Sequence, residues 1–275
     1  MNDENFREWS DAAPFWEKHA ATIRTMFSAV TTALIEEAGI RKGQQVLDVA
    51  GGAGEPSLAI ADLVGPNGSV SYTDLIAGMV SAAEAEARRR GIANVNFRRC
   101  PADSLPFADN SFDTVVSRLG IMFFPDPLLA LREMRRVVRS GGKLSLVVWY
   151  KSEFNPFSYE VANVVSRLLP AQTPSLTHDA FRFAEPGKLA GLLKDAGATG
   201  IRERKLEFDI AAAISPEEFW EMRSETSGTL RDKLKAASVE TRRQLKAEVL
   251  EAIRKYFSGD QMKFPAQVLI VTGIA

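Results

Sequence analysis

The chain has few of the residues that build disulfides or zinc sites. Its 275 residues include one cysteine, Cys100, and two histidines. A single cysteine cannot form an intramolecular disulfide, and two histidines without a cysteine cluster do not supply the ligands of a structural zinc site. We therefore expect no metal site, and we expect Cys100 to pack as a small apolar side chain.

An excess of positive charge and a long apolar run are also missing. The net charge is −1 and the pI is about 6.2. Nucleic-acid-binding proteins neutralise phosphates with a basic surface, so no nucleic-acid partner is expected. No apolar run approaches the roughly 20 residues that span a bilayer, and the acidic start of the chain has no apolar leader segment. These features predict a cytoplasmic protein with no membrane span.

The composition is that of an ordinary globular protein. Hydrophobic residues make up 45% of the chain and charged residues 25%, which is enough apolar material for a sizeable core. We find no internal repeat and no low-complexity segment. A chain of this length can form one large α/β domain with insertions or two modest domains.

A glycine-rich turn stands between an expected strand and an expected helix. Val46–Val49 is an apolar run around Asp48, glycines follow at 51, 52 and 54, and apolar residues resume at helical spacing from Leu58. Two interpretations are open. The glycines could allow the strand and helix to pack closely, or they could let the backbone and the helix N–H groups approach a nucleotide or nucleoside.

Strands and helices then alternate as far as residue 149. Such alternation predicts right-handed βαβ units and a parallel sheet. Outside this core we expect an N-terminal helical arm at 1–40, insertions at 150–185 and 211–264 that pack over one end of the sheet, and closing elements of the sheet at 186–210 and 265–275, all in a single domain. Within the second insertion, Ser215-Pro216-Glu217-Glu218 is a capping box that predicts the start of a helix.

Four stretches together resemble the class I S-adenosylmethionine-dependent methyltransferases, in particular the bacterial quinone-biosynthesis group. They are Leu47-Asp48-Val49-Ala50-Gly51-Gly52-Ala53-Gly54, Tyr72-Thr73-Asp74-Leu75, Ala102-Asp103-Ser104-Leu105-Pro106-Phe107 and the run from Arg132 to Gly142. The resemblance implies a Rossmann-like α/β fold with a seven-stranded, mostly parallel sheet, helices on both faces, a final antiparallel strand and helical insertions. It also implies methyl transfer from S-adenosylmethionine, with S-adenosylhomocysteine as the product.

The resemblance assigns site residues position by position. It implies that the backbone at Ala50, Gly52 and Gly54 lies against the methionine part of the cofactor, and that Asp74 accepts hydrogen bonds from both ribose hydroxyls. Asp103 would receive the adenine amino group, and Arg118 would lie below the sulfonium. The complete implied set is Asp48, Ala50, Gly51, Gly52, Gly54, Asp74, Leu75, Met79, Ala102, Asp103, Ser104, Ser117 and Arg118.

Two positions in this set need comment. The family usually has glycine where Ala50 stands, so we expect the turn to keep φ in a range that alanine tolerates. Asp48, a buried acid below the turn, is expected to be structural and to accept hydrogen bonds from N–H groups of the loop.

Two rival functions use the same glycine turn. The twenty-residue spacing between Gly54 and Asp74 also fits the ribose-binding acid of an NAD(P)-dependent oxidoreductase. Against that alternative, Ser57 stands where a third glycine would be, and the charge of Glu55 at the helix N-terminus would repel a pyrophosphate. A non-catalytic small-molecule binding protein is the other alternative.

The acceptor side of the site is less clearly marked. His19 and His178 are candidate bases, because histidine can accept a proton near neutral pH, but a surface or structural role is the simpler explanation for each. Aromatic residues gather in the flanking segments, where they form either core or an apolar acceptor pocket. We expect a small, apolar or aromatic acceptor. The sequence leaves its identity, the choice among O-, C- and N-methylation, and the oligomeric state open.

Overall fold

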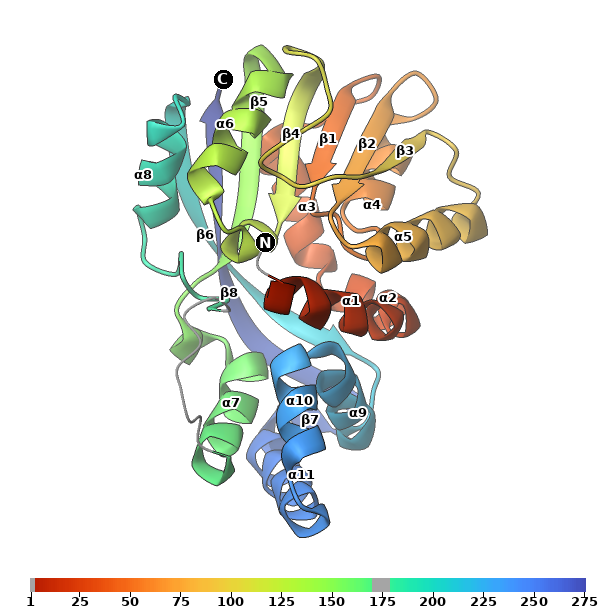
Figure 1. Ribbon diagram of the computed structural model, residues 1–275, viewed down its shortest axis with the longest axis vertical. Helices are drawn as coiled ribbons and strands as arrows, with labels where there is room; N and C mark the ends of the chain where they lie inside the picture. Colours follow the sequence, from red (N-terminus) through yellow and green to blue (C-terminus); the bar gives the residue numbers. More distant parts are fainter. Residues whose placement is uncertain (1–2, 170–178) are drawn as a thin grey trace.

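The computed structural model describes residues 3–169 and 179–275, which form a twisted sheet covered by helices (Figure 1). The order of the strands across the sheet is β3-β2-β1-β4-β5-β8-β6, and a short β7 pairs with β8. Neighbouring strands from β3 to β5 run parallel, whereas β8 is antiparallel to both β5 and β6. The expected sheet with a final antiparallel strand is confirmed, with the two-residue β7 as an addition.

The bounds of the elements follow the alternation seen in the sequence. The strands are β1 Gln45–Val49, β2 Ser69–Asp74, β3 Val95–Arg99, β4 Phe112–Arg118, β5 Val138–Trp149, β6 Thr199–Ala212, β7 Phe257–Ser258 and β8 Gln261–Ile274. The helices are α1 Asp3–Lys18, α2 Ala20–Met26, α3 Ser28–Ala38, α4 Ser57–Val64, α5 Ala77–Arg90, α6 Pro127–Val137, α7 Pro156–Leu168, α8 Lys188–Asp195, α9 Pro216–Thr226, α10 Gly228–Ala236 and α11 Val239–Ile253.

Two layers of core form because neighbouring residues of a strand point to opposite faces. In β1, Val46 belongs to the cluster that includes residues of α3 and α4, whereas Leu47 belongs to the cluster that includes residues of α6 and α8. Val116 and Val115 of β4 divide in the same way. Both faces of the sheet are therefore covered, which is why β1 and β4 bury apolar side chains on both sides of the sheet.

The last two long strands extend beyond the sheet. The expected closing elements of the sheet were 186–210 and 265–275, but β6 and β8 pair from Thr199 with Ile274 to Ala212 with Met262. The extra residues of β8 alternate between exposed and buried, as one face of a two-stranded ribbon requires. Figure 1 shows this ribbon curving away from the sheet toward α7 and α9–α11.

These four helices pack around the ribbon as a lobe, which we call the helical lobe (α7 and α9–α11). Its centre is aromatic: the Phe264 ring lies 5.4 Å from that of Phe219, 5.6 Å from that of Phe157 and 4.3 Å from that of Tyr256, centroid to centroid. The expected capping box begins α9, because Glu218 N–H donates to Ser215 Oγ and Ser215 N–H donates to Glu218 Oε2.

Helix α1 lies between the sheet and the helical lobe (Figure 1). It contacts α5 on the sheet side and α9 and α10 on the lobe side. The Trp16 indole N–H donates to the carbonyl of Thr226 (3.2 Å), and Lys18 pairs with Glu225 (2.9 Å). The N-terminal arm thus forms one wall of the space between the two parts. None of the helices within the described residues is long and apolar enough to span a membrane.

Asp48 links β1 to α4 beneath the glycine turn. Its side chain is completely buried, and Oδ2 accepts a hydrogen bond from the hydroxyl of Ser57, the first residue of α4 (2.7 Å). Oδ1 has no hydrogen-bond partner within the described residues. Burial disfavours the charged form and raises the pKa of Asp48 to about 7, although the Ser57 bond opposes this shift.

We predict that Asp48→Asn changes the pH dependence of stability. Between the unfolded pKa of 3.8 and the folded pKa of about 7, the folded chain binds more protons than the unfolded chain. The contribution of Asp48 to the free energy of unfolding therefore falls as the pH rises through this window. From pH 5 to pH 8, the wild type should lose about 3 kcal/mol relative to the variant in urea unfolding.

Asp62→Asn provides the control, because Asp62 is an exposed carboxylate on α4. The difference in the free energy of unfolding between Asp62→Asn and the wild type should vary little over the same pH range. Parallel pH profiles for Asp48→Asn and the wild type would contradict the assignment of a raised pKa to Asp48.

Candidate cofactor and acceptor site

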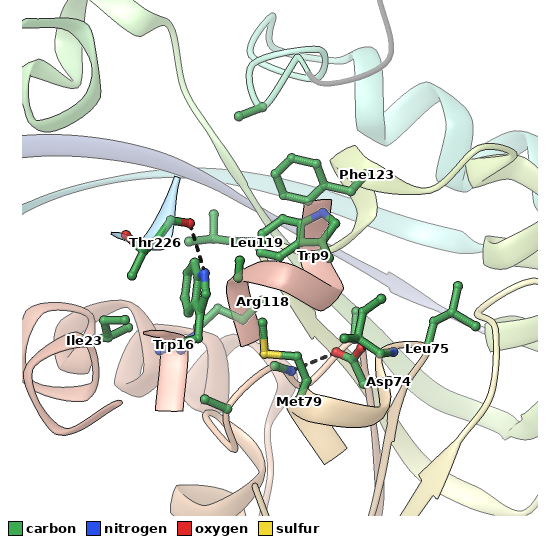
Figure 2. A pocket seen from close by; sticks show the side chains of 18 of the residues that line it. Trp9, Trp16, Ile23, Asp74, Leu75, Met79, Arg118, Leu119, Phe123 and Thr226 are labelled. Atoms are coloured by element: carbon green, nitrogen blue, oxygen red, sulfur yellow. Dashed lines mark hydrogen bonds between the residues drawn. The ribbon is translucent and has the colours of Figure 1, made fainter. Parts of the chain in front are cut away.

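A cavity of about 400 Å³ lies where the carboxyl ends of β1, β2 and β4 meet α1, α2 and the helical lobe. In an open parallel sheet this end of the strands is the usual ligand site. Figure 2 shows the cavity with Asp74 on one side, Thr226 on the other, and Trp16, Arg118 and Trp9 between them. Its walls therefore come from the sheet, the N-terminal arm and the insertions together.

The turn after β1 forms the part of the wall nearest the sheet. Ala50 has φ 60°, so the expectation that its φ stays in a range alanine tolerates is wrong. A left-handed alanine costs about 1–2 kcal/mol. The reversal that requires it is held by backbone bonding, because Gly51 N–H donates to the carbonyl of Thr73 (3.0 Å).

The two glycines that follow Ala50 serve different purposes. A Cβ at Gly51 would overlap the ring of Tyr72, whose hydroxyl donates to the carbonyl of Gly52 (2.6 Å). A Cβ at Gly52 would meet no atom within 4 Å, but its φ of 56° favours glycine. Glycine is thus required at position 51 because the Tyr72 ring packs against it, whereas at Gly52 the space next to the backbone is open.

Asp74, the last residue of β2, has both carboxylate oxygens aligned by the backbone. Oδ2 accepts from Gly52 N–H (3.0 Å), and Oδ1 accepts from Ile76 N–H (2.9 Å). Burial raises the pKa of Asp74 to about 6, and the hydrogen bonds from Ile76 and Gly52 lower it in part. Each oxygen keeps further acceptor capacity, so the carboxylate can bind a vicinal diol.

The loop after β3 supplies a second acid. Asp103 lines the cavity together with Cys100, Pro101 and Ala102. The Cys100 thiol is half-buried, and desolvation raises its pKa to about 11, so it stays protonated. The neighbouring Ser104 does not line the cavity.

Arg118 enters the cavity from the end of β4. One terminal nitrogen donates to Thr31 Oγ1 (2.8 Å) and the other to the carbonyl of Glu55 (3.0 Å), and its guanidinium lies 5.8 Å from the centroid of the Phe27 ring. Burial lowers its pKa, and the negative charges of Glu55 and Asp48 oppose this shift. The guanidinium therefore ties the turn to α3.

Two charged residues near the turn differ from expectation. Glu55 is paired with Arg90 (2.7 Å), so its charge near the start of α4 is balanced rather than free. Arg90 also pairs with Asp62 (2.7 Å) and is only 20% exposed, although a run of three arginines at the end of a helix is usually solvated. The fold of the chain brings α5 against α4, which local charge patterning does not reveal.

His19, one of the two candidate bases, is not among the residues that line the cavity. The His19 ring nitrogen Nε2 lies 2.6 Å from Glu225 Oε2. His19 directly follows α1, and its bond to Glu225 adds to the contact between this end of α1 and α9. His178 lies outside the described residues.

Nine of the thirteen expected cofactor residues line the cavity. These nine are Ala50, Gly51, Gly52, Asp74, Leu75, Met79, Ala102, Asp103 and Arg118. The others are Asp48 and Ser117, which are fully buried, and Gly54 and Ser104, which lie in the flanking loops. Gly54 packs toward Leu58 and the backbone of Ala83, so it serves the contact between turn and helix.

Aromatic side chains line the rest of the cavity. The Trp9 ring lies 5.8 Å from Trp16 and 5.1 Å from Phe123, centroid to centroid (Figure 2). Phe27 and Trp149 form a further edge-on pair at 5.9 Å. Flat apolar walls of this kind suit an apolar or aromatic ligand.

Sequence reasoning missed two arginines in the cavity wall. Arg24 of α2 pairs with Glu86 (2.7 Å), and Arg223 comes from α9 in the helical lobe. The sequence does contain a signal for Arg223, because it follows Phe219 and Met222 and precedes Thr226 at helical spacing, on the buried face of α9.

Several solved structures share the fold of this chain. The chain aligns with the YcgJ protein of Bacillus subtilis at a TM-score of 0.55 and 22% identity, over 89% of this chain and 97% of that one. It aligns with phosphoethanolamine N-methyltransferase 2 of Haemonchus contortus, solved in complex with S-adenosyl-L-methionine, at a TM-score of 0.57 and 18% identity. That alignment covers 98% of this chain and 59% of the other.

Sequence comparisons are more specific. The chain is 36% identical over 174 residues to the ubiquinone/menaquinone biosynthesis C-methyltransferase UbiE of Cellvibrio japonicus. This alignment covers 59% of the present chain and 70% of the relative. It is 32% identical over 189 residues to the UbiE of Shewanella sediminis, in an alignment that covers 65% of the present chain and 75% of that relative. The model of the ubiE/COQ5 methyltransferase family matches residues 26–215. The chain therefore belongs to the ubiE/COQ5 methyltransferase family and is an S-adenosylmethionine-dependent methyltransferase that acts on a small acceptor.

Proposed function

We propose that the whole chain is one methyltransferase domain that binds S-adenosylmethionine at the turn and strand ends of residues 43–149 and methylates an aromatic acceptor held beneath the helical lobe. The observation that carries this proposal is the shape of the cavity. One half is polar and formed by strand ends, and the other is apolar and formed by aromatic side chains.

The polar half fits the cofactor in two respects. The open space at Gly52 accommodates a group lying directly against the backbone, which we assign to the methionine part. The two oriented oxygens of Asp74 suit the two ribose hydroxyls, and Asp103 lies in the adjacent loop, where it can accept from the adenine amino group. When bound, S-adenosylmethionine supplies an electrophilic methyl group on a sulfonium.

The apolar half orients the acceptor. Trp9, Trp16 and Phe123 offer flat faces against which a ring can stack, and together they exclude water from the reacting atoms. Holding a nucleophile in line for displacement is worth several kcal/mol through orientation alone. The electron-rich faces also favour a nearby cation.

We assign the reaction to carbon rather than to oxygen or nitrogen. The curated relatives from Cellvibrio and Shewanella are C-methyltransferases by name. In addition, no histidine of the described chain lines the cavity, and the Cys100 thiol is held protonated. An electron-rich ring carbon can attack the methyl group without prior loss of a proton to a side chain. The carbon–methyl bond forms as the sulfur–methyl bond of the sulfonium breaks, S-adenosylhomocysteine leaves, and the proton of the attacked ring carbon is then released to solvent.

Methyl transfer can be tested with a panel of phenols, hydroquinones and aliphatic amines and with methyl-labelled S-adenosylmethionine. We expect release of S-adenosylhomocysteine that depends on an aromatic member of the panel, and carbon NMR should locate the label on a ring carbon. A label found only on oxygen or nitrogen, or turnover of aliphatic amines alone, would refute the assignment.

Asp74 provides a direct test of the cofactor half. Asp74→Ala should weaken the binding of S-adenosylhomocysteine by about 1–3 kcal/mol in calorimetry, because hydrogen bonds to a charged group are lost. Asp62→Ala removes an exposed carboxylate from α4 and should leave the affinity unchanged. Equal affinities for Asp74→Ala and the wild type would remove Asp74 from the site.

The raised pKa of Asp74 adds a pH dependence. The carboxylate form, which accepts from the ribose, predominates above a pKa of about 6 and is lost below it. The dissociation constant of S-adenosylhomocysteine should therefore rise as the pH falls from 7 to 5, and Asp74→Asn should bind more weakly at pH 7 but with a flatter profile. An identical profile in the variant would show that another group is responsible.

A further inference from the structure

Helix α9 brings a cationic side chain into the apolar half of the cavity. The guanidinium of Arg223 lies 4.8 Å from the centroid of the Phe157 ring, and its Nε is buried without a hydrogen-bond partner. Ser158 and Ser227 line the same region. Figure 2 places Thr226, which is three residues further along α9, across the cavity from Asp74.

The other two arginines of the cavity have partners in the protein. Arg24 pairs with Glu86, and Arg118 donates to Thr31 and to the Glu55 carbonyl. Within residues 3–169 and 179–275, the side chain of Arg223 forms neither a hydrogen bond nor an ion pair. Arg223 therefore differs from its neighbours because no acid of the described chain balances its charge.

Burying a charge without a partner is costly. Burial alone lowers the pKa of Arg223 to about 10, so the guanidinium is still charged at neutral pH. The Phe157 face and the carboxyl-terminal end of α9 compensate in part, each by about 1 kcal/mol or less. The remaining cost is most simply offset by an anion that enters the cavity from outside.

We propose that the acceptor carries a carboxylate and that Arg223 binds it at the end of the cavity remote from Asp74. This inference rests on the proposed function, because it places the acceptor in the apolar half. A carboxylate matches both the single charge and the planar fork of one guanidinium, whereas a phosphate monoester carries nearly two charges. The aromatic walls then hold the body of the acceptor between this anchor and the reacting carbon.

Arg223 lies outside the part of the chain that the family model matches. The family model matches residues 26–215 and ends immediately before α9. The polar half of the cavity lies inside the matched region, whereas Met222, Arg223 and Thr226 lie beyond it. Acceptor choice can therefore differ from that of the relatives while the cofactor half is retained.

The test compares aromatic carboxylates with their neutral amides. Benzoate, 3-phenylpropanoate, 5-phenylpentanoate and the three matching amides are titrated by calorimetry into the full chain, with and without S-adenosylhomocysteine. At least one carboxylate should bind the wild type about tenfold or more tightly than its amide, since charge-assisted bonds in a desolvated site are strong. No preference for any carboxylate would overturn the inference.

Variants assign the preference to Arg223. In Arg223→Met the preference for the carboxylate over its amide should fall below about twofold. In Arg223→Lys this preference should be retained in part, because lysine keeps the charge but lacks the planar fork of the guanidinium. Arg24→Met, which removes a charge from the same cavity, should keep the preference within about twofold of the wild type. A preference that survives Arg223→Met would contradict the proposal.

Thermal unfolding checks the folding of these variants. Without ligand, Arg223→Met should melt at the same temperature as the wild type or higher, because a cation that has no ion-pair partner is removed from a partly buried site. The same titrations distinguish failure of this inference from failure of the proposed function. If S-adenosylhomocysteine binds but no carboxylate is preferred, only the anion site is wrong. If carboxylates are preferred but S-adenosylhomocysteine does not bind, only the cofactor site is wrong.

Discussion

The hydrogen bonds between the turn after β1 and the end of β2 are the constraint on which the site depends. The Gly51 and Gly52 N–H groups donate to Thr73 and Asp74, and the Tyr72 hydroxyl donates back to the turn. These bonds hold Ala50 in a left-handed conformation and orient the Asp74 carboxylate at the same time. The turn and the Asp74 carboxylate therefore depend on the same hydrogen bonds. A shift of β1 against β2 would disturb the turn and the orientation of the carboxylate together.

The sheet and its polar edge could be predicted because local patterns determine them. Alternating apolar strands, a glycine turn and an acid at a strand end are all visible within short windows of sequence, and the topology of parallel strands brings them together. The conformation of Ala50 could not be predicted in this way. Its φ is imposed by bonds to a strand more than twenty residues away, so the propensity of alanine was overridden.

The acceptor half could not be predicted because it is assembled from distant segments. Trp16 of α1 bonds to Thr226 of α9, 210 residues later, and the pairing of Glu55 with Arg90 depends on how two helices pack. The ribbon of β6 and β8 connects the sheet to the helical lobe and so places the lobe beside the cavity. The part of β8 before residue 265 shows itself in the sequence only as a short alternation of polar and apolar residues. Periodicity finds such elements one by one but does not say which faces meet.

The distribution of tryptophan has a further consequence. The chain has four tryptophans, and Trp9, Trp16 and Trp149 line the cavity, whereas Trp220 lies on α9 outside it. Indole emission responds to the polarity and quenching groups around the ring. Three of the four indole rings of this protein therefore stand at the walls of its cavity, where a bound molecule changes their surroundings and their emission reports occupancy.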